Sequence, residues 1–257
     1  MGRFGDDGAR EGGGGIIALI ASRRSDLFVS LVPRVHVCAA TSVDDLEILR
    51  EWITQLGTVI GDVRSLLLSR HIFWEIQRII EHNPKTQTDG LFNRWMATNY
   101  SVSTAIGVRR HLDTDGRSLS LMRLLCVIEE TVLERPSVLS REGFIQNYRP
   151  ELRLVAEQQF DLLAGKDSRC VEPGLIRRDI GRLSSVTEKI KYFANKRVAH
   201  WDHRKVPNAK LGELDECLDL LAELVDKYAR LLTGSGSGVH IDVLPDWKQI
   251  FRVAWID

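Results

Sequence analysis

The sequence contains no uninterrupted apolar run of the roughly 20 residues that a membrane-spanning helix requires. The best candidate, 16–21, is short and is followed at once by Arg23, Arg24 and Asp26. It also differs from a secretory signal, because acidic residues precede it and no clear small-residue cleavage site follows. We therefore expect a soluble, cytoplasmic protein with no membrane partner.

The chain also lacks an excess of charge of either sign, since 35 lysines and arginines balance 35 aspartates and glutamates. Any nucleic-acid site must therefore be a local patch. The four cysteines (Cys38, Cys126, Cys170 and Cys217) are far apart and include no C-x-x-C pair, which predicts reduced thiols. Neither a phosphate-binding P-loop nor a nucleophile elbow occurs. We expect no cofactor and no bound metal.

Glycine is concentrated towards the two ends of the chain. Residues 1–41 include four consecutive glycines at 12–15 and have a composition unsuited to building a core. We predict a poorly ordered N-terminal extension there. Residues 42–233 are predicted to form a helical bundle. The remaining 234–257 read as a Gly/Ser linker followed by an aromatic tail that docks on the bundle.

Apolar residues recur at spacings of three and four along most of the central region, which is the pattern of amphipathic helices. Without alternating strands and helices, this pattern predicts an all-α bundle with long antiparallel helices. Trp52, Trp74 and Trp95 lie on apolar faces and are expected in the core. The predicted helices run from 43 to about 67, through 73–80, and over about 89–112, 118–135, 140–147, 150–164, 174–201 and 211–233.

The densest polar cluster is NKRVAHWDHRK at 195–205, near the end of the helix predicted at 174–201. On an α-helix, His200 would share a face with Lys196 and Arg197. An imidazole beside two cations can move a proton and stabilise charge on phosphorus, which suits phosphodiester chemistry. The alternative is that these basic residues only complement the helix dipole and cap carbonyl groups.

A second polar cluster, formed by Arg109, Arg110 and Asp113, ends the third predicted helix. Arg109 and Asp113 are four residues apart, so one interpretation is an ion pair on the helix surface. The other is that an arginine from this helix reaches the His200 site. A metal site there is not expected, because His200 and His203 lack the spacing of two ligands on one helix face.

The segment 195–202, NKRVAHWD, resembles the signature of HEPN domains, specifically of the abortive-infection U-type group. Three further elements occur in the order found in that group: RRHLD at 109–113, SLSLMRLL at 118–125, and a tail of the form DW-x3-F-x3-W at 246–255. The resemblance covers about residues 43–257.

The resemblance implies a helical bundle, usually dimeric, and in many members a metal-independent ribonuclease of prokaryotic defence or toxin–antitoxin systems. In that chemistry the 2′-hydroxyl of RNA attacks the adjacent phosphate. His200 would transfer the proton, and Arg197 and Lys196 would bind or stabilise the phosphate. Asn195 and Asp202 would orient the site. The implied partners are RNA, a second copy of the chain, and an antitoxin or other protein.

The sequence departs from the family signature, in which an arginine is followed by four to six residues and then the histidine. The corresponding positions, 193–195, hold no arginine, and Arg197 is only three residues before His200. Either Lys196 and Arg197 replace the missing arginine, or the protein binds RNA or a partner without cleaving. The alternative function is a non-enzymatic helical interaction or regulatory module. A metal-dependent hydrolase would need further ligands converging on His200.

Overall fold

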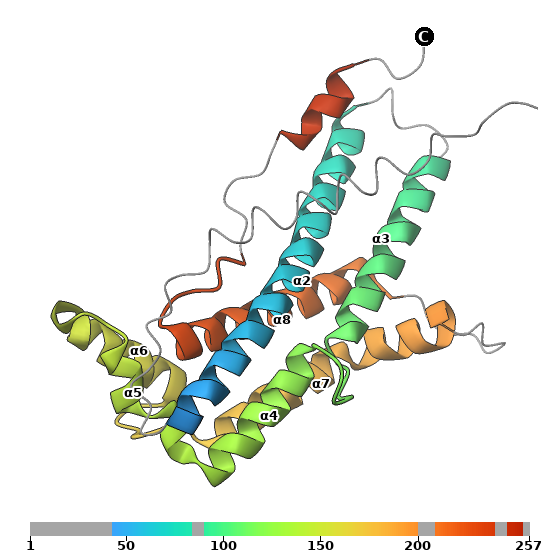
Figure 1. The fold of residues 1–257 in the computed structure, drawn as a ribbon. Coiled ribbons are helices and arrows are strands. Elements are labelled where there is room, and N and C mark those ends of the chain that lie inside the picture. The colour runs from blue at the N-terminus through green and yellow to red at the C-terminus, as the bar shows by residue number, and fades with distance from the viewer. Residues whose placement is uncertain (1–42, 84–89, 200–208, 240–245, 254–257) are drawn as a thin grey trace, which may run out of the picture. The chain divides into compact units, whose positions relative to one another are not determined.

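The fold is described by a computed structural model over residues 43–83, 90–199, 209–239 and 246–253, all within the unit Val37–Asp257. This part of the chain is built from helices and contains no β-strand, which confirms the predicted all-α bundle (Figure 1). The predicted extension at 1–41 lies outside the described residues.

Seven α-helices and four short helical segments follow one another in the described residues. The segment η4 is a π-helix, whereas η2, η3 and η5 are 3-10 helices. The bounds are α2 Val43–His82, α3 Leu91–Arg110, α4 Leu121–Glu134, η2 Pro136–Leu139, α5 Arg141–Gln146, η3 Pro150–Leu152, α6 Arg153–Ala164, α7 Pro173–Phe193, η4 Ala194–Ala199, α8 Leu211–Thr233 and η5 Trp247–Arg252.

The first helix, α2, is continuous over 40 residues, so the prediction of two helices in this region is wrong. The apolar stripe lapses near Ser69 and Arg70, but neither residue interrupts helical backbone bonding as proline would. Arg70 forms an ion pair with Asp219 on α8, in which Arg70 Nη1 lies 2.6 Å from Asp219 Oδ1. The lapse in periodicity here marks a polar contact with α8 and not a helix end.

Residues at two helix ends explain where α4 begins and where α8 ends. Ser120 is the N-cap of α4, because its Oγ accepts a hydrogen bond from the Arg123 N–H at 3.0 Å. The helix therefore begins at Leu121, slightly later than predicted. At the end of α8, Gly234 adopts a left-handed conformation with φ 72°. The Tyr148 hydroxyl donates to the Gly234 carbonyl at 2.7 Å, which ties this turn to the segment after α5.

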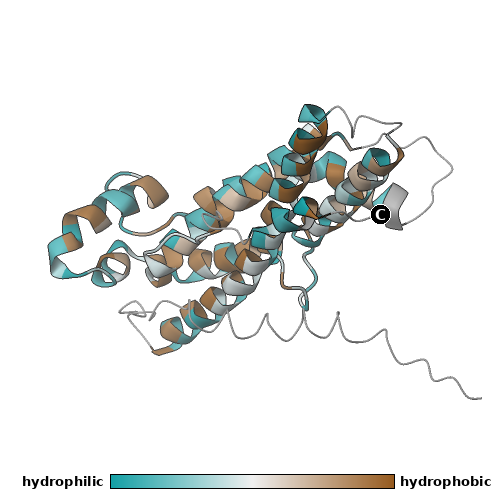
Figure 2. Cartoon of the chain, turned by 90° about the horizontal axis from the view of Figure 1, so that it is seen from above, coloured by the Kyte–Doolittle hydropathy of each residue, from teal (hydrophilic) through white to brown (hydrophobic). Residues whose placement is uncertain are grey.

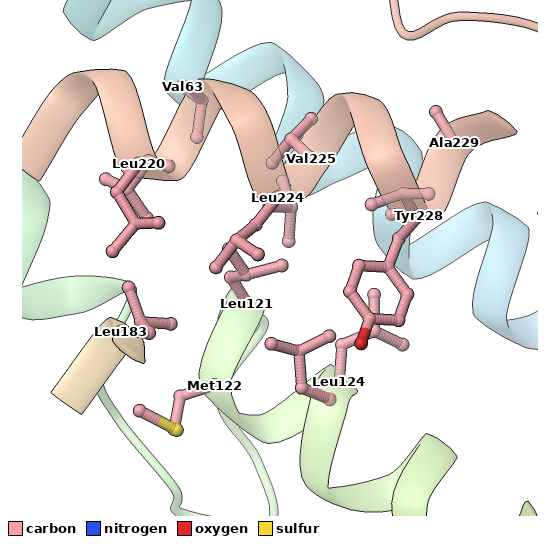
Figure 3. Close-up of a cluster of buried hydrophobic side chains, with 14 of the residues drawn as sticks. Val63, Leu121, Met122, Leu124, Leu183, Leu220, Leu224, Val225, Tyr228 and Ala229 are labelled. Atoms are coloured by element: carbon pink, nitrogen blue, oxygen red, sulfur yellow. The ribbon is translucent and has the colours of Figure 1, made fainter. Parts of the chain in front are cut away.

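The core forms around α8, which packs against α2, α3, α6 and α7. Figure 3 shows side chains from α2, α4, α7 and α8 pointing toward one another in this core. Each large apolar side chain that is fully buried there contributes about 1.5–3 kcal/mol relative to an exposed one. The buried members include Val63, Leu121, Leu124, Leu183, Leu224, Val225 and Tyr228.

The three tryptophans expected in the core have different environments. Trp52 is buried at 2% exposure and Trp74 is half-buried, but Trp95 is 61% exposed. The prediction for Trp95 is therefore wrong. Leu91 and Phe92, in the same two turns of α3, are also exposed, so no described segment covers this end of the helix.

A buried ionic network ties α7 to α8. Asp179 is 4% exposed, and its Oδ2 lies 2.6 Å from Lys227 Nζ. The Tyr228 hydroxyl donates to the same oxygen at 3.0 Å. Burial, followed by the nearby Asp179 charge, raises the pKa of Tyr228, so that the phenol stays protonated as a donor. The network satisfies a carboxylate that would otherwise be costly to bury.

The three cysteines within the described residues are free thiols. Cys126 and Cys170 are half-buried, and burial raises the pKa of the fully buried Cys217 to about 12. A thiol with so high a pKa is a poor nucleophile and behaves as a small apolar side chain. This confirms the expectation of reduced thiols for these positions, while Cys38 lies outside the described residues.

The described helices mix hydrophilic and hydrophobic residues along their lengths (Figure 2). Accordingly, none of them is both long and apolar enough to cross a membrane.

Near the C-terminus, the Lys248 ammonium of η5 lies 2.5 Å from a carboxylate oxygen of Glu75 on α2. Phe251 is 47% exposed and Trp255 lies outside the described residues, so docking of the whole aromatic tail stays a prediction.

Candidate functional site

The end of α3 and the segment η4 bring together residues that are far apart in the sequence. Arg109 Nε donates to Asn195 Oδ1 at 2.8 Å, across 86 residues of chain. Arg109 Nη1 also lies 4.0 Å from Asp113 Oδ2, at the outer limit of an ion pair. We refer to Arg109, Asp113, Asn195 and its neighbour Lys196 as the α3–η4 cluster. Arg109 thus makes the predicted local ion pair at its outer distance limit, and its reach to the His200 site stays a prediction because His200 lies outside the described residues.

The segment that carries Asn195 and Lys196 has a geometry that its sequence does not signal. The α-helix α7 ends at Phe193 and is followed by the π-helix Ala194–Ala199. The prediction of one α-helix over 174–201 is therefore wrong at its end. Because a π-helix bonds residues five apart, an α-helical face shared by Lys196 and residues beyond it cannot be assumed. Such π-helical turns are frequent at functional sites.

Arg110 does not join the α3–η4 cluster. Its Nη2 lies 2.9 Å from Asp62 Oδ2 on α2. Consecutive residues of an α-helix point about 100° apart, so the two arginines of the RRHLD element serve different neighbours. Arg110 links α3 to α2, and Arg109 links α3 to η4.

Three of the predicted site residues lie wholly or partly outside the described residues. His200 and Asp202 lie outside the described residues, and so does the side chain of Arg197, whose backbone belongs to η4. The described part of the predicted site consists of the four members of the α3–η4 cluster and Arg110, which pairs with Asp62 instead. His203 also lies outside the described residues.

The α3–η4 cluster has the chemistry of an anion-binding site. Arg109 is 44% exposed in its side chain and uses Nε for Asn195, which leaves Nη donors for a ligand. Lys196 forms no ion pair with any described residue and adds a second cation. The Arg109 guanidinium suits a phosphate group, which can accept two parallel hydrogen bonds from arginine, and Lys196 follows Asn195 directly in the sequence.

A histidine in the RRHLD element is buried beside this cluster. His111 is fully buried, and neither ring nitrogen has a hydrogen-bond partner among the described residues. Burial lowers its pKa to about 4, with nearby Asp62 opposing the shift and Arg110 adding to it. His111 is therefore neutral at pH 7 and shielded from solvent. The sequence does not predict this burial, because His111 directly follows two arginines.

A second polar cluster, not anticipated from the sequence, joins α2, α3 and α8. The half-buried carboxylate of Asp215 accepts from Trp74 Nε1 at 3.0 Å and from the Tyr100 hydroxyl at 3.5 Å. Burial raises the pKa of Asp215, opposed mainly by Arg70. The ring of Phe73 stacks on Tyr100 with centroids 4.2 Å apart. These hydrogen bonds link the three helices, and the carboxylate that accepts them comes from α8.

The described residues offer no assembled metal site. No group of three or more histidine, cysteine, aspartate or glutamate side chains in this part of the chain is placed to hold an ion.

Comparisons with protein-family models, with curated proteins and with solved structures found no match.

Proposed function

We propose that the protein is HEPN-like and acts on RNA, with the α3–η4 cluster binding a phosphodiester. The observation that carries the proposal is the 2.8 Å hydrogen bond between Arg109 and Asn195. It brings the RRHLD element beside the NKRVAHWD element, the two parts of the resemblance that hold charged residues suited to phosphate. Arg109 supplies from a neighbouring helix the guanidinium that 193–195 lack.

In the proposed reaction, the 2′-hydroxyl oxygen of a ribose attacks the adjacent phosphorus. His200 accepts the hydroxyl proton as the new P–O bond forms. Arg109 and Lys196 stabilise the negative charge on the phosphoryl oxygens. The bond to the 5′-oxygen breaks and that oxygen takes up a proton, leaving a 2′,3′-cyclic phosphate and a free 5′-hydroxyl. No metal ion takes part.

A binding-only role is the second candidate, and one observation favours it. The described members of the α3–η4 cluster are two cations, an amide and a carboxylate that already faces Arg109. They can hold a phosphate, but proton transfer depends on His200. If His200 is not catalytic, the same surface still binds RNA without cleaving it. A regulatory module of the toxin–antitoxin or defence type would then use the surface to recognise RNA.

The test is incubation of the purified full chain with a mixed RNA pool in the presence of a chelator. We expect cleavage that leaves cyclic phosphate ends. His200→Ala should lower the rate by about 10²–10⁴-fold, the usual contribution of a general acid–base group. Arg109→Ala should lower it by about 10²-fold or more, because it removes a charge-stabilising donor.

Two controls match these variants. Arg117→Ala removes the same charge from an arginine whose side chain is 94% exposed and which, among the described residues, pairs with nearby Asp115 alone, so it should retain full activity. Lys191→Ala, at an exposed lysine five residues earlier on α7, is the control for a further variant, Lys196→Ala, which removes the second cation proposed to stabilise the phosphoryl oxygens. Cleavage that persists in His200→Ala would identify a contaminating nuclease and refute the catalytic role. If the wild type neither cleaves nor binds RNA, the proposal as a whole is refuted.

A further inference from the structure

One face of α3 is exposed along nearly its whole length. Trp95 is 61% exposed and Ile106 is 48% exposed, and Asn99 between them is also exposed. Trp95 and Arg109 are fourteen residues apart, which places them within about 40° of each other around the helix and about 21 Å apart along it. We call Phe92, Trp95, Asn99, Ile106 and Arg109 the α3 outer face. It ends at the α3–η4 cluster.

Two aromatic rings stand together at the far end of this face. Phe92 is 63% exposed, and its ring centroid lies 5.8 Å from that of Trp95 with a tilt of 31° between the planes. The pair therefore forms a platform that no other described residue covers. Exposed aromatic rings are the side chains on which the bases of single-stranded nucleic acids stack, whatever their sequence.

The charge of α3 favours a polyanion as the partner of this face. The twenty residues of α3 include three arginines and no acidic residue. Arg94 lies next to Trp95 in the sequence, is exposed, and forms no ion pair with any described residue. Between the aromatic pair and Ile106, the exposed residues of α3 are the polar Thr98, Asn99 and Ser103, while Val102 is half-buried, so the exposed surface between the pair and Ile106 is polar.

We propose that the α3 outer face is a track for single-stranded RNA. A nucleobase stacks on Phe92 and Trp95, while a phosphate of the same strand is bound at Arg109. Trp95 and Arg109 are about 21 Å apart along the helix. This distance corresponds to about six nucleotides of a stacked strand, in which successive nucleotides are about 3.4 Å apart, and to fewer nucleotides of an extended strand. This inference rests on the proposed function and adds to it a substrate class, unpaired RNA with a base anchored several nucleotides from the bound phosphate.

The test is the affinity of the full chain for a fluorescein-labelled 12-nucleotide 2′-O-methyl RNA, which cannot be cleaved through its 2′ position. Fluorescence anisotropy at constant salt gives the Kd. We expect Trp95→Ala to raise the Kd by about 5- to 150-fold, the range for loss of one stacked base. Trp95→Phe, which keeps a stacking ring, should restore most of the affinity. Leu91→Ala removes a side chain that is 76% exposed at the same helix end but has no ring, and it should bind like the wild type.

The outcomes separate this inference from the proposed function. Equal Kd values for the wild type and Trp95→Ala, with weaker binding by Arg109→Ala, overturn the track and leave an RNA-binding cluster standing. No binding by the wild type overturns both. Light scattering on the same samples gives the oligomeric state. A change of that state in Trp95→Ala with unchanged RNA affinity would show that the platform is a protein interface, which also overturns the track.

Discussion

Lowering the pH tests the burial of His111, whose imidazole has no hydrogen-bond partner among the described residues. Its pKa falls from 6.5 to about 4, chiefly because burial disfavours the charged ring; Asp62 opposes this and Arg110 adds to it. Between these pKa values the unfolded chain binds a proton that the folded chain does not. The free energy of unfolding therefore falls as the pH falls. The stability that depends on a neutral His111 ring is fully present only above about pH 6.5.

The magnitude follows from the two pKa values. Since one pKa unit corresponds to about 1.4 kcal/mol, the His111 contribution should lose about 2 kcal/mol between pH 7 and pH 5. Urea unfolding followed by circular dichroism at both pH values measures it. His111→Leu lacks the titrating ring, so the difference in stability between wild type and variant should change by this amount. At pH 7 the two should be close, because the variant also removes an unsatisfied buried polar group.

His82→Gln is the matched control, because it removes an exposed imidazole near the end of α2 and should keep the wild-type dependence on pH. Two results would refute the reasoning. One is a stability difference between wild type and His111→Leu that is the same at both pH values. The other is a His111 ring that titrates near pH 6.5 in the folded protein when followed by nuclear magnetic resonance.

Two further predictions concern stability and are measured by the same urea unfolding. A Cβ added at Gly107 would lie 2.5 Å from Leu66 Cδ2, whereas one added at Gly57 would meet nothing within 4 Å. Gly107→Ala should therefore be less stable than Gly57→Ala by about 1–2 kcal/mol, and equal stabilities would refute the close packing of α2 on α3. Lys227→Met removes the ion-pair partner of the buried Asp179 and should cost about 1–3 kcal/mol. An unchanged stability would mean that the pair is not maintained in solution.

Much of the fold could be predicted because its signals are local. The apolar stripe of α8 is bounded by the glycine-rich segment that begins at Gly234, and the helix spans Leu211–Thr233 as predicted. The sequence does not predict the exposure of Trp95, because periodicity shows which residues share a helix face but not whether another element covers that face. It does not predict the continuity of α2 for a different reason: polar residues at 69 and 70 interrupt the apolar stripe without ending the helix.

The candidate site could be predicted only in part, because it depends on which helices are neighbours. The sequence identified Arg109 and Asn195 as members of two separate motifs and left open whether they meet. Their contact spans 86 residues of chain, and only the packing of α3 against η4 brings it about. The π-helix at Ala194–Ala199 has no composition that distinguishes it from α-helix, so no local signal announced it.

The π-helical turn also changes how this chain should be aligned with others. A turn whose backbone bonds run from residue i to i+5 holds one residue more than an α-helical turn, so η4 acts as a one-residue insertion confined to Ala194–Ala199. Residue counts taken across it are therefore not equivalent to counts along an uninterrupted α-helix. A motif defined by spacing along one helix is then a poor guide to this protein, in which the guanidinium beside Asn195 comes from α3.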